Sequence, residues 1–525
     1  MLSALKQTKL RKHIRPIALF ALLVTWSSEA VFSQNPAKAD DAFDIGNYIE
    51  ATEEYRKLVD KDPDNQEYNE RLGLSYLKTY IDPLLALEYL VKAEKLGKVD
   101  KEIYLHLAKA STFHLDYDQA LFYLNRFEDE GGVKKKNIDD FEKLKDATLA
   151  AQDLLKYPVD VNFNRLSKEV NSDYPDYHPF ITKDGNTLYF TSRRKLKPGA
   201  KPEFDGYFPS DIFMSERTET GWTKADRLPP PINTPYDEQA VGITNSGDSL
   251  FFYIDHVRNF GDIYVSAKEV GVFSKPKYLE KQINSESVES ACSISNDGKT
   301  MLFSSERDGG YGQLDIYMVK KLPSGEWSVP ANLGNDINSS FNEDFPTLSG
   351  DGKTMYFSSD GHPGMGGYDL FFSTWDDDNS VWTKPQNLGY PINTPFDNKN
   401  ISYTQDGDVA YATRVEAGSN TQLDIYEIRF NKRQSEDPAI FLINIPACAE
   451  ISGAAPEITV KNELDNMVGR YKPNQITGRY VLALYPGKYF MYVDAEGFQP
   501  YTEVLIVNNY HTRQDINVKL IKLKK

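Results

Sequence analysis

Apolar residues recur at intervals of three and four between Asp40 and about Leu155, the spacing of one face of an α-helix. A longer period overlies this spacing, because a small residue is followed four positions later by a larger apolar one, repeatedly, at intervals of 35 and 34 residues. These pairs are Ala51 with Tyr55, Ala86 with Leu90, and Ala120 with Leu124. A small residue lets two helices cross closely, and the larger one fills the groove beside it. The pattern predicts about three stacked helix pairs over residues 34–156.

After Tyr157 the helical spacing ends and short stretches of alternating polarity follow, until about Phe430. Tight turns rich in Asp, Asn and Gly lie at 183–185, 245–247, 296–298, 350–352 and 405–407, where these residues tolerate positive φ. Each turn precedes an expected strand, at Thr187–Thr191, Ser249–Tyr253, Thr300–Ser304, Thr354–Ser358 and Val409–Thr413. The sequence therefore predicts five copies of one β-hairpin unit.

A third strand of each unit opens with an Asp-aliphatic-aromatic triplet that recurs every 51 to 55 residues, at 211–213, 262–264, 315–317, 369–371 and 424–426. A fourth strand is marked by an aromatic residue and ends in an Ile-Asn turn, and the markers are Trp222, Phe273, Trp327 and Trp382. Four strands per unit predict a β-propeller over 157–435, with five blades or, alternatively, six. The last unit lacks its fourth strand, and we expect Val159–Phe163 to supply it and close the ring.

Residues 436–525 show a third pattern, with short alternating strands around turns, for example Tyr480–Leu484 and Lys488–Val493 on either side of Pro486 and Gly487. This segment predicts a small β-sandwich. The expected fold class is therefore multidomain: an all-α helical-repeat domain, a β-propeller and a small β-sandwich.

Residues 1–33 have the layout of a secretory signal peptide, with five basic residues before an apolar run at 17–26 and then small or polar residues up to Ser33. An uncleaved anchor is the alternative, but the run is too short to span a bilayer, so no integral membrane span is expected after signal removal. The formal charge of -17 argues against nucleic-acid binding, which needs a basic footprint.

Cofactor and metal chemistry find no support in the sequence. Cys292 and Cys448 are the two cysteines; they lie in different predicted domains and are expected to be buried thiols, with a single disulfide as the alternative. No Cys/His cluster has zinc-ligand spacing, and calcium at 376–378 lacks the spacing of an EF-hand loop. We therefore predict neither a cofactor nor a metal.

The Gly-rich segment 360–367 raises the question of phosphate binding. Its glycines follow no phosphate-loop spacing, and no helix follows that would point its N-terminus at an anion. The segment is expected to connect the second and third strands of the fourth blade.

One face of the predicted propeller collects basic residues, because the loops between second and third strands and those between blades emerge on the same side. This candidate partner surface comprises Arg193, Arg194, His256, Arg258, Arg307, His362 and Arg414. The alternative is that these side chains pair with blade acids such as Asp205, Asp211 and Asp262.

Catalytic patterns are weak. No Gly-x-Ser-x-Gly occurs, and His178, His256 and His362 stand at different blade positions without a recognisable nucleophile. Neighbouring acids such as Glu343 and Asp344 would face opposite sides of a strand. The sequence thus predicts no catalytic residues and no enzyme.

Three resemblances follow from these motifs. Pro63, Leu72, Gly73 and Tyr76 complete a pattern similar to the tetratricopeptide repeat, whose arrays bind peptides or proteins or act as spacers. The fifty-residue units resemble the TolB-type, WD40-like propeller repeat. The Gly-x-Tyr, Pro-Gly-x-Tyr and Gly-Phe elements of the last segment resemble the carboxypeptidase regulatory-like domain, a structural or binding module.

In this order the segments resemble PorE-like periplasmic proteins of Bacteroidota, which are associated with type IX secretion and gliding. In that family an OmpA-like peptidoglycan-binding domain follows the sandwich, and no segment here corresponds to it, so attachment to the cell wall is not carried over. The resemblance implies a noncatalytic periplasmic adaptor, associated with the outer membrane through envelope or secretion-system proteins. The alternative is a glycan- or peptide-binding protein, or a hydrolase, that uses the propeller mouth.

Overall fold

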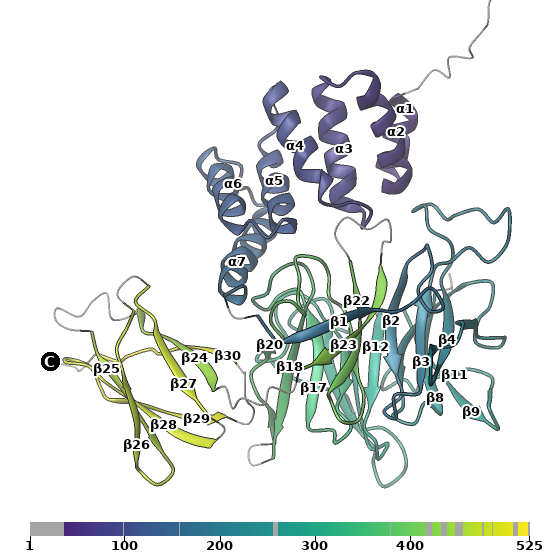
Figure 1. The fold of residues 1–525 in the computed structure, drawn as a ribbon. Coiled ribbons are helices and arrows are strands. Elements are labelled where there is room, and N and C mark those ends of the chain that lie inside the picture. The colour runs from purple at the N-terminus through teal and green to yellow at the C-terminus, as the bar shows by residue number, and fades with distance from the viewer. Residues whose placement is uncertain are drawn as a thin grey trace, which may run out of the picture.

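The computed structural model describes residues 36–522, apart from 98, 157, 256–260, 378–379, 416–422, 432–437, 447–454, 475–476, 486 and 508–512. The predicted signal peptide lies outside the described residues. Within them, helices come first and antiparallel sheets follow, so the predicted helical domain and propeller-like domain are confirmed (Figure 1). None of the described helices combines the length and hydropathy that crossing a membrane requires.

The helices stack as neighbouring pairs, as the long period predicted. They are α1 (Pro36–Asp44), α2 (Tyr48–Lys61), α3 (Gln66–Lys78), α4 (Leu85–Leu96), α5 (Glu102–Phe113), α6 (Tyr117–Asp129) and α7 (Ile138–Leu154). Asn47, Asn65 and Asp116 cap α2, α3 and α6 with their side-chain oxygens. Helices α3 and α4 cross closely at Gly73, where an added Cβ would lie 2.7 Å from Cγ of Leu90, so a larger residue would push the helices apart.

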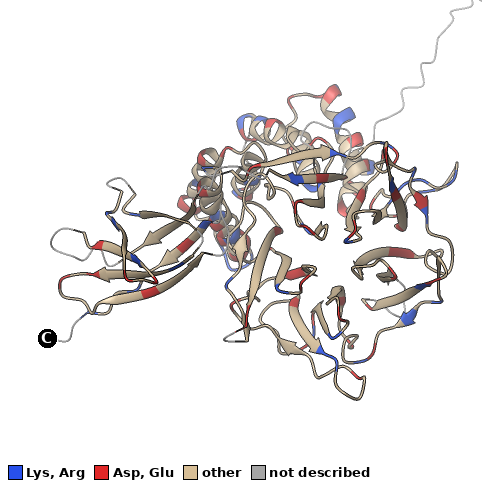
Figure 2. Cartoon of the chain, turned by 60° about the horizontal axis from the view of Figure 1, so that its bottom comes forward, with Lys and Arg blue, Asp and Glu red and all other residues tan. Residues whose placement is uncertain are grey.

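The propeller-like domain contains five sheets, set around a common centre (Figure 2). The first holds β2 (Asp176–Ile181), β3 (Thr187–Ser192), β4 (Asp211–Thr218), β5 (Gly221–Trp222) and β6 (Asp226–Arg227). The second holds β7 (Asp237–Ile243), β8 (Ser249–Asp255), β9 (Ile263–Glu269), β10 (Val272–Phe273) and β11 (Lys277–Tyr278). The third holds β12 (Glu289–Ile294), β13 (Thr300–Ser305), β14 (Asp315–Lys320) and β15 (Ala331–Asn332). The fourth holds β16 (Glu343–Leu348), β17 (Thr354–Ser359), β18 (Asp369–Asp376), β19 (Val381–Trp382) and β20 (Gln386–Asn387).

The fifth sheet joins the beginning of this domain to its end. It orders β1 (Val161–Arg165) beside β23 (Asp424–Phe430), then β22 (Val409–Arg414) and β21 (Ile401–Tyr403). β1 runs antiparallel to β23, with Val161 opposite Phe430. The predicted ring closure is therefore confirmed, with the closing strand beginning two residues later than expected.

The outer strand is broken in the first four sheets but continuous in the fifth, which the aromatic markers did not reveal. In the fourth sheet, for example, β19 and β20 both pair with β18, and Pro385 directly precedes β20. Pro276 and Pro330 stand in the same place before β11 and β15. Proline has no N–H to donate to a ladder, so the strand cannot run through it.

The C-terminal strands form two sheets that share one core. They are β24 (Ala439–Asn444), β25 (Glu457–Asn462), β26 (Met467–Tyr471), β27 (Tyr480–Leu484), β28 (Gly487–Asp494), β29 (Tyr501–Val507) and β30 (Arg513–Asn517). One sheet has the order β27-β24-β30 and the other β26-β25-β28-β29. Buried residues of both, among them Phe441, Val460 and Met491, pack together. One pair, β24 with β30, is parallel rather than antiparallel.

Candidate functional site at the face between helices and propeller

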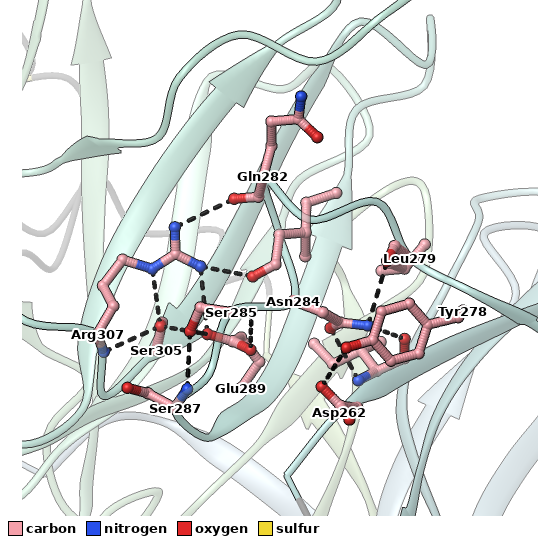
Figure 3. A network of polar contacts seen from close by, with 12 residues as sticks. Asp262, Tyr278, Leu279, Gln282, Asn284, Ser285, Ser287, Glu289, Ser305 and Arg307 are labelled. Carbon is pink, nitrogen blue, oxygen red and sulfur yellow. Dashed lines mark hydrogen bonds and ion pairs between the residues drawn. The ribbon is translucent and has the colours of Figure 1, made fainter. Parts of the chain in front are cut away.

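Each connection between blades is held by a hydrogen-bond network, shown for residues 262–307 in Figure 3. Asn284 accepts a bond from the backbone N–H of Ile263 at 3.1 Å, and its amide donates to the carbonyls of Ile263 at 2.9 Å and Leu279 at 3.4 Å. Glu289, which begins β12, accepts bonds from the backbone N–H and hydroxyl of Ser285 at 2.8 and 2.7 Å. The Ile-Asn turn thus binds the third strand of its own blade, and the following acid fixes the first strand of the next.

Arg307 completes this network from the loop after β13 (Figure 3). Its guanidinium donates to the hydroxyl of Ser305 at 2.9 Å, to the carbonyl of Gln282 at 3.1 Å and to Glu289 at 3.2 Å. The carboxylate of Glu289 is fully buried and the Arg307 side chain is 16% exposed. A charged pair at this depth needs all of its hydrogen bonds satisfied, which fixes both side chains in place.

The same arrangement recurs around the ring. Asparagines that bond both backbone groups of a third-strand residue are Asn171, Asn233, Asn284, Asn338 and Asn393. A side chain five residues after each asparagine accepts from the Ser or Thr that follows the asparagine, and these acceptors are Asp176, Glu238, Glu289, Glu343 and Asn398. These repeated polar side chains therefore hold each blade to the next one.

All members of the predicted basic surface that the structure describes take part in such contacts. Arg194 pairs with Asp176 at 2.6 Å, and His362 shares a 2.7 Å hydrogen bond with the carbonyl of Ile337. Arg414 donates to the carbonyl of Pro391 at 2.6 Å.

Arg193 pairs with Asp205 at 2.6 Å and with Glu203 at 2.7 Å. Asp211 pairs with Arg227, and Asp262 accepts from Tyr278 at 2.9 Å. Of the three acids expected as partners, Asp205 therefore holds a member of the basic surface, whereas Asp211 pairs with another arginine and Asp262 with a tyrosine. His256 and Arg258 lie outside the described residues.

The helices cover the same face of the propeller (Figure 1). Tyr80, which follows α3, donates its hydroxyl to Asp397 at 3.2 Å. Phe113, at the end of α5, packs on Phe396 with ring centroids 4.6 Å apart. Phe396 is 7% exposed and belongs to the hydrophobic core of the helices. The propeller loop that carries Phe396 thus packs against the hydrophobic core of the helical domain.

The Gly-rich segment 360–367 contributes to this contact, and it connects β17 to β18 as predicted. Asp360 pairs with Lys143 of α7, and Met365 packs with Tyr117 of α6. The backbone N–H of Met365 donates to Asp369 at 2.7 Å. The segment therefore connects β17 to β18 and also contacts helices α6 and α7.

The central axis of the ring is closed by two side chains from blades that are not neighbours in the ring. His178 in β2 and Phe345 in β16 meet with ring centroids 4.3 Å apart. Both have positive φ, 51° and 49°, beside irregularities in the register of their strands. Such a backbone is strained for residues other than glycine, and here it turns both rings toward the axis.

The groups around His178 and Phe345 are titratable and enclosed. Asp344 accepts the hydroxyl of Ser290 at 2.6 Å, and burial raises its pKa against the opposing effects of Lys399 and Ser290. Burial lowers the pKa of His178 to about 3, so its ring is neutral at neutral pH. In the sequence, Asp344 is recognised as a strand neighbour of Glu343, and Lys399 belongs to no motif. Both directly follow the acceptor of a turn between blades, Glu343 and Asn398, which is the signal they share.

Catalytic chemistry gains little from these groups. His178 packs on Phe345, and its Nδ1 has no hydrogen-bond partner among the described residues. Glu343 and Asp344 bond different partners, Ser339 and Ser290, as expected for neighbours on a strand. Over the described part of the chain, no three His, Cys, Asp or Glu side chains gather as metal ligands do.

Cys292 is buried at 1% exposure and its thiol is free, as predicted. Burial raises the pKa of this thiol, so it is not a thiolate at neutral pH. Cys448 lies outside the described residues.

Comparisons with known proteins give distant similarities alone. No family model and no curated protein matches the chain. Solved structures that resemble it include one described as a glycoside hydrolase, with 11% identity, a TM-score of 0.37 and coverage of 55% of this chain and 99% of the other. Another is the periplasmic gluconolactonase PpgL of Pseudomonas aeruginosa, with 12% identity, a TM-score of 0.27 and coverage of 63% and 88%. Similarity at this level carries no inference about activity or substrate.

Proposed function

We propose that this chain is a noncatalytic scaffold of the periplasm that joins proteins at the cell envelope, in keeping with its resemblance to PorE-like proteins. The observation that carries the proposal is the position of the helices. Tyr80 and Phe113 contact Asp397 and Phe396, which lie in a loop between two blades. These contacts join the helical domain to the propeller, as expected of a scaffold.

The proposal includes the finer architecture. The five sheets are five blades, residues 34–156 form tetratricopeptide-type repeats, 157–435 the TolB-type propeller and 436–525 the regulatory-like sandwich. The antiparallel pairing of β1 with β23 supports five blades, because it joins the first and last strands of the domain in one sheet. A closed ring offers no free sheet edges, which suits a rigid adaptor.

The sandwich supplies a surface for a partner, which we call the outer sandwich face: Phe490, Tyr492, Val504 and Ile506. In β28 and β29 the alternate residues are buried in the core, so these four point outward. Val504 lies opposite Phe490, and Val504 and Ile506 are 46% and 60% exposed. An exposed apolar strip of this kind marks interaction sites.

Lysines flank this strip. Lys461 lies over the Tyr492 ring at 5.7 Å and Lys488 over the Phe490 ring at 5.9 Å. We therefore infer that the partner is an envelope protein whose own apolar strip is flanked by carboxylates.

A binding experiment tests this function. The partner is isolated from the envelope fraction with the mature protein, and its affinity is then measured by calorimetry for wild type, for Ile506→Glu and for Val270→Glu. Val270 is as apolar and fully exposed, but it lies in a propeller turn, so it is the matched control. We expect Ile506→Glu to weaken binding by roughly tenfold or more and Val270→Glu to leave it unchanged.

Two results would contradict the proposal. One is equal binding by Ile506→Glu and wild type. The other is turnover of any member of a glycan, peptide or lactone panel by the purified protein, provided that the activity follows the protein through purification.

A further inference from the structure

The last pair of helices, α6 and α7, ends the helical stack on the side of the sandwich (Figure 1). In a stacked array each helix pair covers the apolar face of the pair before it, and the final pair presents a polar outer surface to solvent. Here Phe122 of α6 and Leu149 of α7 are 55% and 47% exposed. The end of this array therefore carries two large apolar side chains that the described residues leave uncovered.

Two hydrogen bonds fix how α6 and α7 lie against each other. Gln152 donates to Asp118 at 2.7 Å, and Lys145 donates to Glu128 at 2.9 Å. The two helices therefore run antiparallel, and between these bonds position 122 of α6 comes opposite position 149 of α7. The two exposed apolar side chains thus belong to one patch rather than to separate surfaces.

Carboxylates surround this patch, which we call the terminal helix face: Phe122 and Leu149 with the exposed acids at helical spacing from them. These acids are Asp118, Asp129, Glu142 and Asp146. None of the four forms an ion pair with a basic side chain among the described residues.

The cations nearest to the terminal helix face are already neutralised. Lys145 pairs with Glu128 at 2.9 Å. Arg126 pairs with Glu94 at 2.5 Å and with Glu130 at 3.0 Å. The face therefore combines an apolar centre with a rim of net negative charge.

The terminal helix face is continuous with the contact between α7 and the sandwich. Asp153, one turn after Leu149, pairs with Arg479 and, at 3.7 Å, with Arg513. A segment that lies along the face therefore reaches the sandwich at one end, where an interface within the chain is already formed.

We propose that the terminal helix face binds an amphipathic helix of a partner protein, with apolar residues on one side and Lys or Arg on its flanks. The bound helix takes the place that a further repeat would have in the stack, so its apolar stripe covers Phe122 and Leu149. Its basic flanks pair with the four carboxylates of the rim. This inference rests on the proposed scaffold function and adds a second contact, separate from the outer sandwich face.

Designed peptides test the proposal on the wild-type protein. The probe is a helical peptide of Leu, Lys and Ala whose leucines form one stripe, titrated by calorimetry. One comparison peptide has Glu in place of Lys, and another has the composition of the probe in scrambled order. We expect saturable binding of the probe and binding weaker by roughly tenfold or more for both comparison peptides.

The scrambled peptide separates a built site from general attraction to an acidic chain, because it has the same charge as the probe but no apolar stripe. Equal affinity for the probe and the scrambled peptide would overturn the proposal. No binding of the probe would overturn it as well.

Single variants locate the site. Phe122→Ala removes one large side chain of the terminal helix face, and the control Val329→Ala removes an apolar side chain that is 85% exposed on the propeller. We expect Phe122→Ala to bind the probe more weakly by roughly fivefold or more and Val329→Ala to bind it like wild type. Wild-type affinity in Phe122→Ala would place binding elsewhere and overturn the proposal.

Two further variants complete the test. Leu149→Ala replaces Phe122→Ala if that variant melts below the wild-type temperature, and the same loss of affinity is expected. Ile506→Glu should bind the probe like wild type, because it changes only the outer sandwich face. Failure of this inference and failure of the proposed function are therefore distinguishable.

Discussion

The basic residues that the sequence suggests as a binding surface make hydrogen bonds and ion pairs within the propeller. Arg307 faces a loop region, yet its donors end on Ser305, on Glu289 and on the carbonyl of Gln282. The sequence shows one or more basic residues per blade. In the described residues, Arg194, Arg307, His362 and Arg414 each bond a backbone carbonyl just before the asparagine of a turn between blades, which gives this regularity a structural reason.

The buried acids of these networks should make stability depend on pH. Burial raises the pKa of Glu343 to about 7 despite bonds from Ser339 and Ser359, whereas the unfolded chain titrates near 4.5. The folded state therefore binds this proton more tightly, and the resulting stability is complete below pH 4.5 and is lost as pH rises through about 7.

Glu343→Gln removes this titration. Between pH 5 and pH 8 we expect wild type to lose about 2 kcal/mol more of its free energy of unfolding than the variant, measured by urea denaturation. Glu306→Gln, at an exposed position directly after β13 in the neighbouring sheet, is the control. An equal pH slope for wild type and Glu343→Gln would show that Glu343 is ionised in the folded protein.

At the scale of elements, the ring depends on a strand borrowed from the other end of the domain. β1 follows the last helix directly and becomes the outer strand beside β23. The N–H of Leu166 donates to the carbonyl of Ile425 at 3.1 Å, and by alternation the N–H of Asn164 also points at β23. The chain segment that follows α7 thus joins the helices to the propeller and, as β1, also closes the ring.

Asn164→Pro tests the closing strand. The side chain of Asn164 is exposed, so the substitution removes a ladder hydrogen bond without removing packing. We expect a loss of about 2 kcal/mol in the free energy of unfolding relative to Asn164→Ala, and faster hydrogen exchange in β23. If the proline and alanine variants are equally stable, β1 does not close the ring in solution.

At the scale of the whole molecule, α7 holds all three parts together. Lys143 pairs with Asp360 of the propeller. Asp153, the second-last residue of the same helix, pairs with Arg479 and Arg513 of the sandwich. The sandwich is thereby fixed beside the helices by charge, while the helices sit on the propeller partly through apolar contacts.

Asp153→Ala should release the sandwich. Removing the carboxylate leaves two arginines facing each other without their shared acceptor, so we expect a measurable rise in the radius of gyration by small-angle scattering, with unchanged propeller stability. Asp146→Ala changes an exposed acid on the same helix and should have no effect. The same scattering curve for wild type and Asp153→Ala would mean that other contacts hold the sandwich.

The sequence by itself determined the local elements, because their causes are local. Glycines in the hairpin turns have positive φ, for example 75° at Gly185 and 71° at Gly352, and the strands predicted after them extend one or two residues further. Apolar periodicity similarly predicted the helix pairs, since the close crossing at Gly73 requires a small residue. The broken outer strands were missed, although proline at 276, 330 and 385 carried the signal.

Only the tertiary structure decided how the face of the propeller is used. The meeting of His178 with Phe345 and the packing of Phe396 among the helices each join residues from separate blades or domains. No sequence spacing encodes such distances, because they depend on how the ring closes and on where the helices dock. Contacts between blades and domains therefore depend on the tertiary structure, whereas the helices and strands follow from local sequence patterns that repeat along the chain.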